Sequence, residues 1–219
     1  RRIDGAHVHA LTTPLITKAD GTKFGKTESG TVWLDPELTS PYAFFQFWLN
    51  ADDRDIPVLL RTFSFKDKAE IDELITATNE RPYERAAQRA LAEELTELVH
   101  GTEEMRGAEA AGRVLFGQGD LDEVPAGTLS AALMETPHCF LESGELQNGQ
   151  LPPIDELFVR SGLVQSKGAA RRVMQEGGAY VNNVRVSDSS QRLSTDDLVH
   201  GRWLVLRRGK KSVSGLRVG

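Results

Sequence analysis

The charge of this chain is divided unevenly along its length, which indicates two parts of different character. Residues 1–152 carry 14 Lys and Arg against 26 Asp and Glu, a net charge of −12. Residues 153–219 carry 12 against 6, a net charge of +6. We therefore expect an acidic body that carries a basic unit at its C-terminal end. Such a unit is typical of a nucleic-acid contact, but a solvated basic face without a partner explains the charge equally well.

The composition is that of a globular protein. With 219 residues, 39% of them hydrophobic, the chain is long enough for two or three small domains. Its single cysteine, Cys139, excludes an internal disulfide, and no stretch of roughly 18 apolar residues could span a membrane. We expect a reducing compartment, the cytoplasm. The chain begins without Met or a signal-peptide pattern, which predicts a start within a longer protein.

The N-terminal third is expected to contain a strand, a loop and a helix. Residues 6–17 alternate and are rich in β-branched residues, which predicts a strand. The segment "KADGTKFGKTESG" follows, with turn signals at Asp20-Gly21 and Ser29-Gly30, and predicts a mobile loop. Ser40 and Pro41 then predict a helix start. The next residues are expected to pack as core at the joint between two units: Tyr42, Phe44, Phe45, Phe47 and Trp48.

Three helices are predicted between residues 67 and 116. Asp67 and Glu70 have the spacing of a capping box at the start of the first helix. The second is expected to begin at Pro82 and to end at Gly101, and the third to begin at Thr102. Residues 117–152 lose regular periodicity and contain several Gly and Pro, which predicts a linker region.

The C-terminal segment has a different pattern. Pro153 predicts a helix start, and Ser166 is a suitable N-cap for a second helix, in which Lys167 and Arg171 share one face with Arg172 beside them. The run "AYVNNVRV" predicts two strands joined by an Asn-Asn turn, because Asn tolerates the positive φ of a tight hairpin. A further strand is expected in "RWLVLRRG".

Lys23 and Lys26 are the first candidates for chemistry. Two cations in a loop that contains glycine suit a polyphosphate whose charge grows during reaction, but solvated loop lysines are common and no Walker pattern is present. No metal site is predicted, because His7 and His9 lack a third ligand of suitable spacing. No group orients Cys139 beside His138, so we assign no covalent catalysis.

The longer stretch "GTKFGKTESGTVWLDPELTSPYAFFQFWLN" closely resembles the bacterial tyrosyl-tRNA synthetases, class I enzymes with a KMSKS-type loop. The loop is written here as Lys23, Phe24, Gly25, Lys26 and Thr27. The resemblance implies that these five residues bind ATP, a substrate that comes with Mg²⁺. It also implies that the catalytic residues Lys23 and Lys26 stabilise the pyrophosphate as tyrosyl-adenylate forms, with Thr27 as a supporting hydroxyl.

The resemblance continues to the end of the chain. The segment "ELFVRSGLVQSKGAARRVMQEGGAYVNNVRV" is similar to the ribosomal-protein-S-four-like RNA-binding module that many of these enzymes carry. The implied RNA contacts, made more to phosphates and 2′-hydroxyls than to base edges, are Ser166, Lys167, Arg171, Arg172 and Asn182.

The fold class expected from this resemblance is multi-domain, α/β and α+β. Residues 1–66 would be the C-terminal end of a Rossmann-type catalytic domain, 67–116 a helical anticodon-side domain, 117–152 a linker and 153–219 the RNA-binding module. The HIGH-type motif and the tyrosine pocket are missing, so we expect this chain to be inactive by itself. The complete protein would be a homodimeric ligase, with no membrane contact, acting on tyrosine, ATP and tRNA(Tyr).

Two other classes of function stay open. A non-catalytic RNA-binding protein would use the basic C-terminal unit as its working surface and keep the lysine loop without its chemistry. A small phosphate-handling enzyme such as a kinase is less favoured, because no phosphate-cradling strand, loop and helix is visible in the sequence.

Overall fold

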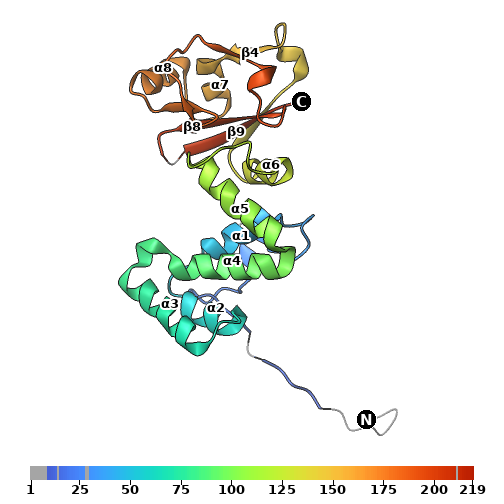
Figure 1. The fold of residues 1–219 in the computed structure, drawn as a ribbon, viewed down its shortest axis with the longest axis vertical. Coiled ribbons are helices and arrows are strands. Elements are labelled where there is room, and N and C mark those ends of the chain that lie inside the picture. The colour runs from blue at the N-terminus through green and yellow to red at the C-terminus, as the bar shows by residue number, and fades with distance from the viewer. Residues whose placement is uncertain (1–8, 14, 28–29, 211) are drawn as a thin grey trace, which may run out of the picture.

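The structure is a computed structural model, and it describes residues 9–13, 15–27, 30–210 and 212–219. It is a mixed α and β protein in which a group of helices is followed by a sheet covered by further helices (Figure 1). Residues 9–13 extend away from the helices, and the C-terminus lies at the far end of the molecule beside the sheet (Figure 1).

Six α-helices and one 3₁₀ turn follow one another between residues 41 and 134. Their bounds are α1 Pro41–Leu49, α2 Ile56–Phe63, α3 Lys68–Glu80, a 3₁₀ turn Pro82–Glu84, α4 Ala86–His100, α5 Thr102–Leu115 and α6 Ala126–Met134. The predicted cap of α1 is confirmed, because the Ser40 side chain accepts a hydrogen bond from the Ala43 N–H, with Pro41 at the first helical position. The capping box of Asp67 and Glu70 is also confirmed.

The predicted start of the second helix is wrong by four residues. Pro82 opens only a 3₁₀ turn, and Arg85 takes the left-handed conformation, with φ of 51°, before α4 begins at Ala86. The guanidinium of Arg85 donates hydrogen bonds to the carbonyls of Leu49 and Ala51, at 2.8 to 3.1 Å. These hydrogen bonds satisfy carbonyl groups at the C-terminal end of α1. They could not be predicted from residues 82–86 alone, because their acceptors are more than 30 residues earlier in the chain.

The aromatic run forms part of the core, as predicted. Tyr42, Phe44, Phe45 and Trp48 are buried, and α1 packs against α4 and α5. The run therefore joins the N-terminal segment to the helices that follow residue 67. Burial of these side chains is a major contribution to the stability of this half of the chain.

The second half is built on a sheet with strand order β3-β9-β8-β5-β6. β3 is parallel to β9, and the other pairs are antiparallel. A second pair, β4-β7, is antiparallel. The bounds are β3 His138–Leu141, β4 Gln150–Pro153, α7 Ile154–Arg160, α8 Lys167–Gln175, β5 Ala179–Val181, β6 Val184–Arg185, β7 Arg192–Ser194, β8 Trp203–Arg208 and β9 Ser212–Val218, with 3₁₀ turns at Ser143–Glu145 and Thr195–Asp197.

Two of the local signals of this half, the cap of α8 and the Asn-Asn hairpin, are confirmed. The Ser166 side chain caps α8 by accepting a hydrogen bond from the Ala169 N–H. Asn182 and Asn183 form the turn of the β5-β6 hairpin with φ of 45° and 65°, the left-handed values that such a turn requires. Pro153 is the N-cap of α7 rather than its first helical residue.

The prediction of a linker at residues 117–152 is wrong as a description of structure. This segment contains α6, and it supplies β3 and most of β4. Leu141 and Leu151 are buried in the core of the C-terminal half. β3 pairs with β9, more than 70 residues later in the chain. A short strand whose only partner is distant gives little periodicity of its own, which explains the mistake.

The five-stranded sheet has a core on each face. Leu204, Leu206 and Leu216 belong to the cluster that includes residues of α7 and α8. Trp203 and Val205 instead belong to the cluster of the helical half, where α6 covers the sheet (Figure 1). The side-chain amide of Asn183 also donates to the carbonyl of Val114 in α5, at 2.7 Å. The sheet is therefore packed directly against the helices.

The strand expected at residues 6–17 is not found in the part that the structure describes. Residues 9–13, 15 and 16 are in no strand, and Thr17 makes only an isolated bridge with Lys23. Residues 6–8 and 14, and with them His7, lie outside the described residues. An alternating pattern forms a stable strand only where a neighbouring strand accepts its hydrogen bonds, and among the described residues no strand lies beside residues 9–13, 15 and 16.

Candidate functional site

The lysine loop consists of two small hairpins in succession. The first turns at Asp20 and Gly21, with the Asp20 carboxylate accepting hydrogen bonds from the N–H and the hydroxyl of Thr22. The second pairs β1 Lys26–Thr27 with β2 Gly30–Thr31. Between them Gly25 has φ of 79°, a left-handed conformation that favours glycine. Gly25 therefore sets the reversal of the chain between Lys23 and Lys26.

Phe24 anchors this loop to the helices. Its ring lies 5.4 to 5.5 Å, centroid to centroid, from the rings of Phe47, Trp48 and Phe63. These distances are in the range of favourable aromatic pairs. Phe24 lies between the two lysines but contacts protein, while the side chain of Lys23 is exposed to solvent.

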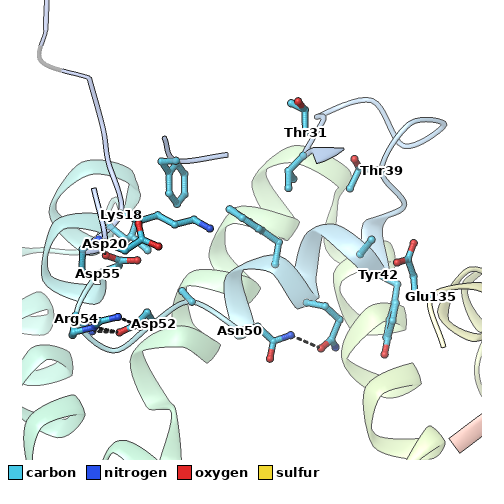
Figure 2. Close-up of a pocket in the computed structure, with 18 of the residues that line it drawn as sticks. Lys18, Asp20, Thr31, Thr39, Tyr42, Asn50, Asp52, Arg54, Asp55 and Glu135 are labelled. Atoms are coloured by element: carbon cyan, nitrogen blue, oxygen red, sulfur yellow. Dashed lines mark hydrogen bonds and ion pairs between the residues drawn. The ribbon is translucent and has the colours of Figure 1, made fainter. Parts of the chain in front are cut away.

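A cleft of about 590 Å³ opens between the lysine loop and α1. Figure 2 shows Lys18, Asp20 and Asp55 on one side of it, and Thr39, Tyr42 and Glu135 on the other. The Asp55 carboxylate accepts a hydrogen bond from the Ala19 N–H, which ties the loop to the start of α2. The cleft has both charged and apolar walls, as small-molecule sites commonly do.

Two of the charged groups that line the cleft, Asp52 and Arg54, form an ion pair. The side-chain hydrogen bond from Arg54, 2.7 Å from Asp52, is the main cause that holds the pKa of Asp52 well below its ordinary value. The pKa of Asp20 is also lowered, mainly by the hydroxyl of Thr22. Burial, reinforced by the charge of Glu135, raises the pKa of Tyr42 to about 12, so its hydroxyl stays protonated.

The second candidate site is the basic face of α8. Lys167 Nζ lies 2.9 Å from a carboxylate oxygen of Glu156, and Arg171 Nη2 lies 2.9 Å from Asp155, both residues of α7. Arg172 is exposed, and within the part of the chain that the structure describes it makes no ion pair. The exposed ammonium and guanidinium groups of this face can bind phosphate oxygens.

Asn182 has a role inside the protein. Its side-chain oxygen accepts a hydrogen bond from the Val205 N–H at 2.9 Å, and its amide donates to the carbonyl of Asp197 at 2.6 Å. Ser166 similarly uses its hydroxyl as the N-cap of α8. Of the five residues expected at an RNA face, the structure therefore brings Lys167, Arg171 and Arg172 together on α8, and it gives Asn182 the role of fixing a turn.

Three residues beside these sites escaped the sequence analysis. Lys18 lines the cleft, while Asp155 and Glu156 hold the cations of α8. Lys18 is the first residue of the segment "KADGTKFGKTESG", but it is not part of the motif that contains Lys23 and Lys26. Asp155 and Glu156 could be recognised in the sequence as acidic residues in the first turn of α7, where the helix dipole favours them. Their cationic partners could not be identified in this way, because they belong to a different helix.

Other possible chemistry is limited. Among the described residues, no group of three or more His, Cys, Asp or Glu is arranged to hold a metal ion. Burial raises the pKa of the Cys139 thiol, which makes it a poor nucleophile at neutral pH. No helix in the described ranges is both long and apolar enough to cross a bilayer.

Comparison with known proteins gives two family matches. Residues 1–117 match the family described as "tRNA synthetases class I (W and Y)", and residues 137–214 match "Tyrosine–tRNA ligase SYY-like C-terminal domain". The second match begins one residue before β3.

Curated relatives cover almost all of this chain. A protein of Thermobifida fusca named tyrosine–tRNA ligase is 61% identical over 99% of this chain and 50% of its own length. One of Streptomyces avermitilis with the same name is 60% identical over 97% of this chain and 49% of its own length. The chain thus spans about half the length of the curated relatives that it matches.

Proposed function

This chain belongs to the tyrosyl-tRNA synthetases of class I, and we propose that it works as the C-terminal half of a tyrosine–tRNA ligase. Residues 1–66 would complete a Rossmann-type catalytic domain, 67–116 would form the anticodon-side helical domain, and the basic unit would bind RNA. One observation carries the proposal: within a match that spans residues 1–117, the lysine loop is anchored by Phe24, which also lines a cleft beside α1.

The proposed reaction is the activation of tyrosine. The substrate carboxylate attacks the α-phosphorus of ATP, accompanied by Mg²⁺, which gives tyrosyl-adenylate and pyrophosphate. Lys23 and Lys26 would bind the oxygens of the leaving pyrophosphate, where negative charge grows, and Thr27 would add a hydroxyl donor. Gly25 and the packing of Phe24 support this role, since they set the position of the loop that carries both lysines.

The proposed second step transfers tyrosine to tRNA(Tyr). The basic face of α8, with Lys167, Arg171 and Arg172, would contact phosphates of the tRNA, and Ser166 would add contacts through its backbone and hydroxyl. We leave Asn182 out of this surface because its amide is bonded within the protein. We further propose that the complete enzyme is a homodimer that acts in the cytoplasm.

The catalytic proposal is tested by tyrosine-dependent exchange of pyrophosphate into ATP. The continuous protein, with the N-terminal half supplied, should be active, and Lys26→Ala should lower kcat by about 100-fold, the usual cost of removing one donor to developing charge. Lys68→Ala, a change of the same kind at the start of α3, is the control and should have no effect. Full exchange by the Lys26→Ala enzyme would refute the role of that lysine.

The alternative is a non-catalytic RNA-binding protein, favoured by the exposed cations of α8. It predicts that tRNA binds while exchange activity is absent even in the continuous protein. The chain of 219 residues alone is expected to bind tRNA and to show no exchange under either proposal. The measurement on the continuous protein therefore decides between them.

A further inference from the structure

Two neighbouring carboxylates of α7 hold two cations of α8 in different ways. Asp155 has only 3% of its surface exposed, and one of its oxygens accepts hydrogen bonds from Nε and Nη2 of Arg171, at 3.1 and 2.9 Å. The side chain of Arg171 is itself 58% exposed. A buried anion thus fixes one edge of a guanidinium whose other edge faces solvent.

Glu156 holds its partner at the surface. Its side chain is 28% exposed, and it contacts Lys167 at 2.9 Å and Arg160 at 2.8 Å. Arg160 also pairs with Glu145. The hydrogen bond from Lys167 is the largest of the causes that lower the pKa of Glu156, so this carboxylate stays charged near neutral pH. The ammonium of Lys167, a compact point charge, is partly neutralised by an exposed anion.

These geometries have opposite consequences for an incoming phosphate. Arg171 has five N–H donors, and Nε and Nη2 donate to Asp155 while Nη1 is left without a hydrogen bond to the described residues. Holding the fork in place lowers the entropy that binding would cost. Glu156 instead competes with phosphate for the ammonium of Lys167, because an exposed carboxylate offers the same kind of acceptor.

We propose that Asp155 is a positioning residue for the RNA contact of Arg171, and that Glu156 opposes RNA binding by occupying Lys167. This inference rests on the proposed function, because it requires the basic face of α8 to be an RNA surface. The proposal predicts that removing the charge of Asp155 and removing the charge of Glu156 change RNA affinity in opposite directions. An effect of net charge alone would change the affinity in the same direction for both.

The test uses the 219-residue chain and a tRNA(Tyr) transcript, with affinity measured at several salt concentrations. Asp155→Asn and Glu156→Gln each remove one negative charge and keep the size of the side chain. Glu156→Gln should tighten binding about threefold. It should also steepen the slope of log affinity against log salt by about the amount expected for one more phosphate contact. Asp155→Asn should weaken binding about tenfold, the usual scale of a charged hydrogen bond.

Three further variants, each changed at Arg171, separate positioning from damage to the fold. Arg171→Ala should weaken binding by a similar factor, and Asp155→Asn added to it should cause no further loss, since the residue to be positioned is gone. Arg171→Lys keeps the charge but loses the forked geometry of the guanidinium. On a logarithmic scale, it should restore less than half of the tRNA affinity that Arg171→Ala loses. Arg171→Lys can be measured even if Asp155→Asn prevents folding, because it keeps Asp155.

Two results would overturn the inference while leaving the proposed RNA surface intact. In the first, Asp155→Asn tightens binding as Glu156→Gln does. In the second, its effect persists in full when Arg171 is already alanine. A different result, unchanged affinity and salt slope for Arg171→Ala, Arg172→Ala and Lys167→Ala together, would refute the RNA surface itself and the inference with it.

Discussion

Phe24 and Tyr42 both line the cleft beneath the lysine loop, but they have different surroundings. Phe24 is half-buried among three aromatic rings, which suits a residue that anchors a loop. Tyr42 is 6% exposed, and its phenol carries a pKa of about 12 because burial disfavours the phenolate. Burial therefore has a different consequence for each residue: it anchors the loop through Phe24, and it raises the pKa of Tyr42.

The raised pKa of Tyr42 predicts how stability depends on pH. Because the folded protein holds the phenolic proton more tightly than the unfolded chain, the contribution is complete below pH 10 and is lost as the pH rises toward 12. The loss amounts to at most about 3 kcal/mol. Denaturant unfolding of the wild type and of Tyr42→Phe, compared across this range, measures it. Parallel pH curves for the two proteins would contradict the prediction.

Two helices of the first half, α1 and α3, begin at a residue whose side chain caps them. The Asp67 carboxylate accepts a hydrogen bond from the Glu70 N–H at 2.9 Å, and the Glu70 carboxylate accepts one from the Asp67 N–H at 3.0 Å. Both groups belong to one turn of chain, so the sequence carries the whole signal. Arg85 shows the opposite case, since its partners lie on the chain before α2.

Removal of the cap of α3 should be measurable. Asp67→Ala is expected to lower the free energy of unfolding by about 1 kcal/mol, because the donors of the first turn lose their acceptor. Asp72→Ala, at an exposed position within the same helix, is the control. It should be neutral or slightly stabilising, since alanine has the higher helix propensity. Equal losses for the two variants in chemical denaturation would argue against the cap.

The whole molecule depends on a sheet that is packed on both faces. Leu133 of α6 approaches the sheet at Gly215 of β9, beside Trp203 of β8. A Cβ at Gly215 would lie 2.9 Å from Cζ3 of Trp203 and 3.2 Å from Cβ of Leu133. Glycine is therefore required here by close approach between the two halves.

Gly215→Ala should lower the free energy of unfolding by about 1 to 3 kcal/mol, the usual cost of overfilling a packed site. Gly127→Ala in α6 is the matched control, because apart from its chain neighbours and the nearby backbone of its own helix no described atom lies within 4 Å of the added methyl group. We expect it to be neutral or to stabilise the helix slightly. Thermal unfolding of both variants tests this, and equal stability of the two would show that the packing at Gly215 can relax.

Much of the local structure was predictable because its causes are local. The caps at Ser40, Asp67 and Ser166 and the Asn-Asn hairpin each depend on residues within a few positions of one another. The candidate lysine loop was also recognisable, since its motif is continuous. The linker prediction was wrong because β3 acquires its structure from β9, whose distance along the chain a local pattern does not encode.

By itself, then, the sequence determined the family, the positively charged C-terminal unit and the starts of α1, α3, α5 and α8, because motifs, charge and helix-start signals are properties of neighbouring residues. Only the tertiary structure decided that residues 138–141 complete a sheet, that Phe24 faces an aromatic cluster, and that Asp155 and Glu156 reach the cations of α8. Each of these depends on contacts between segments that are separated in sequence, and folding selects them through burial and pairing of the whole chain.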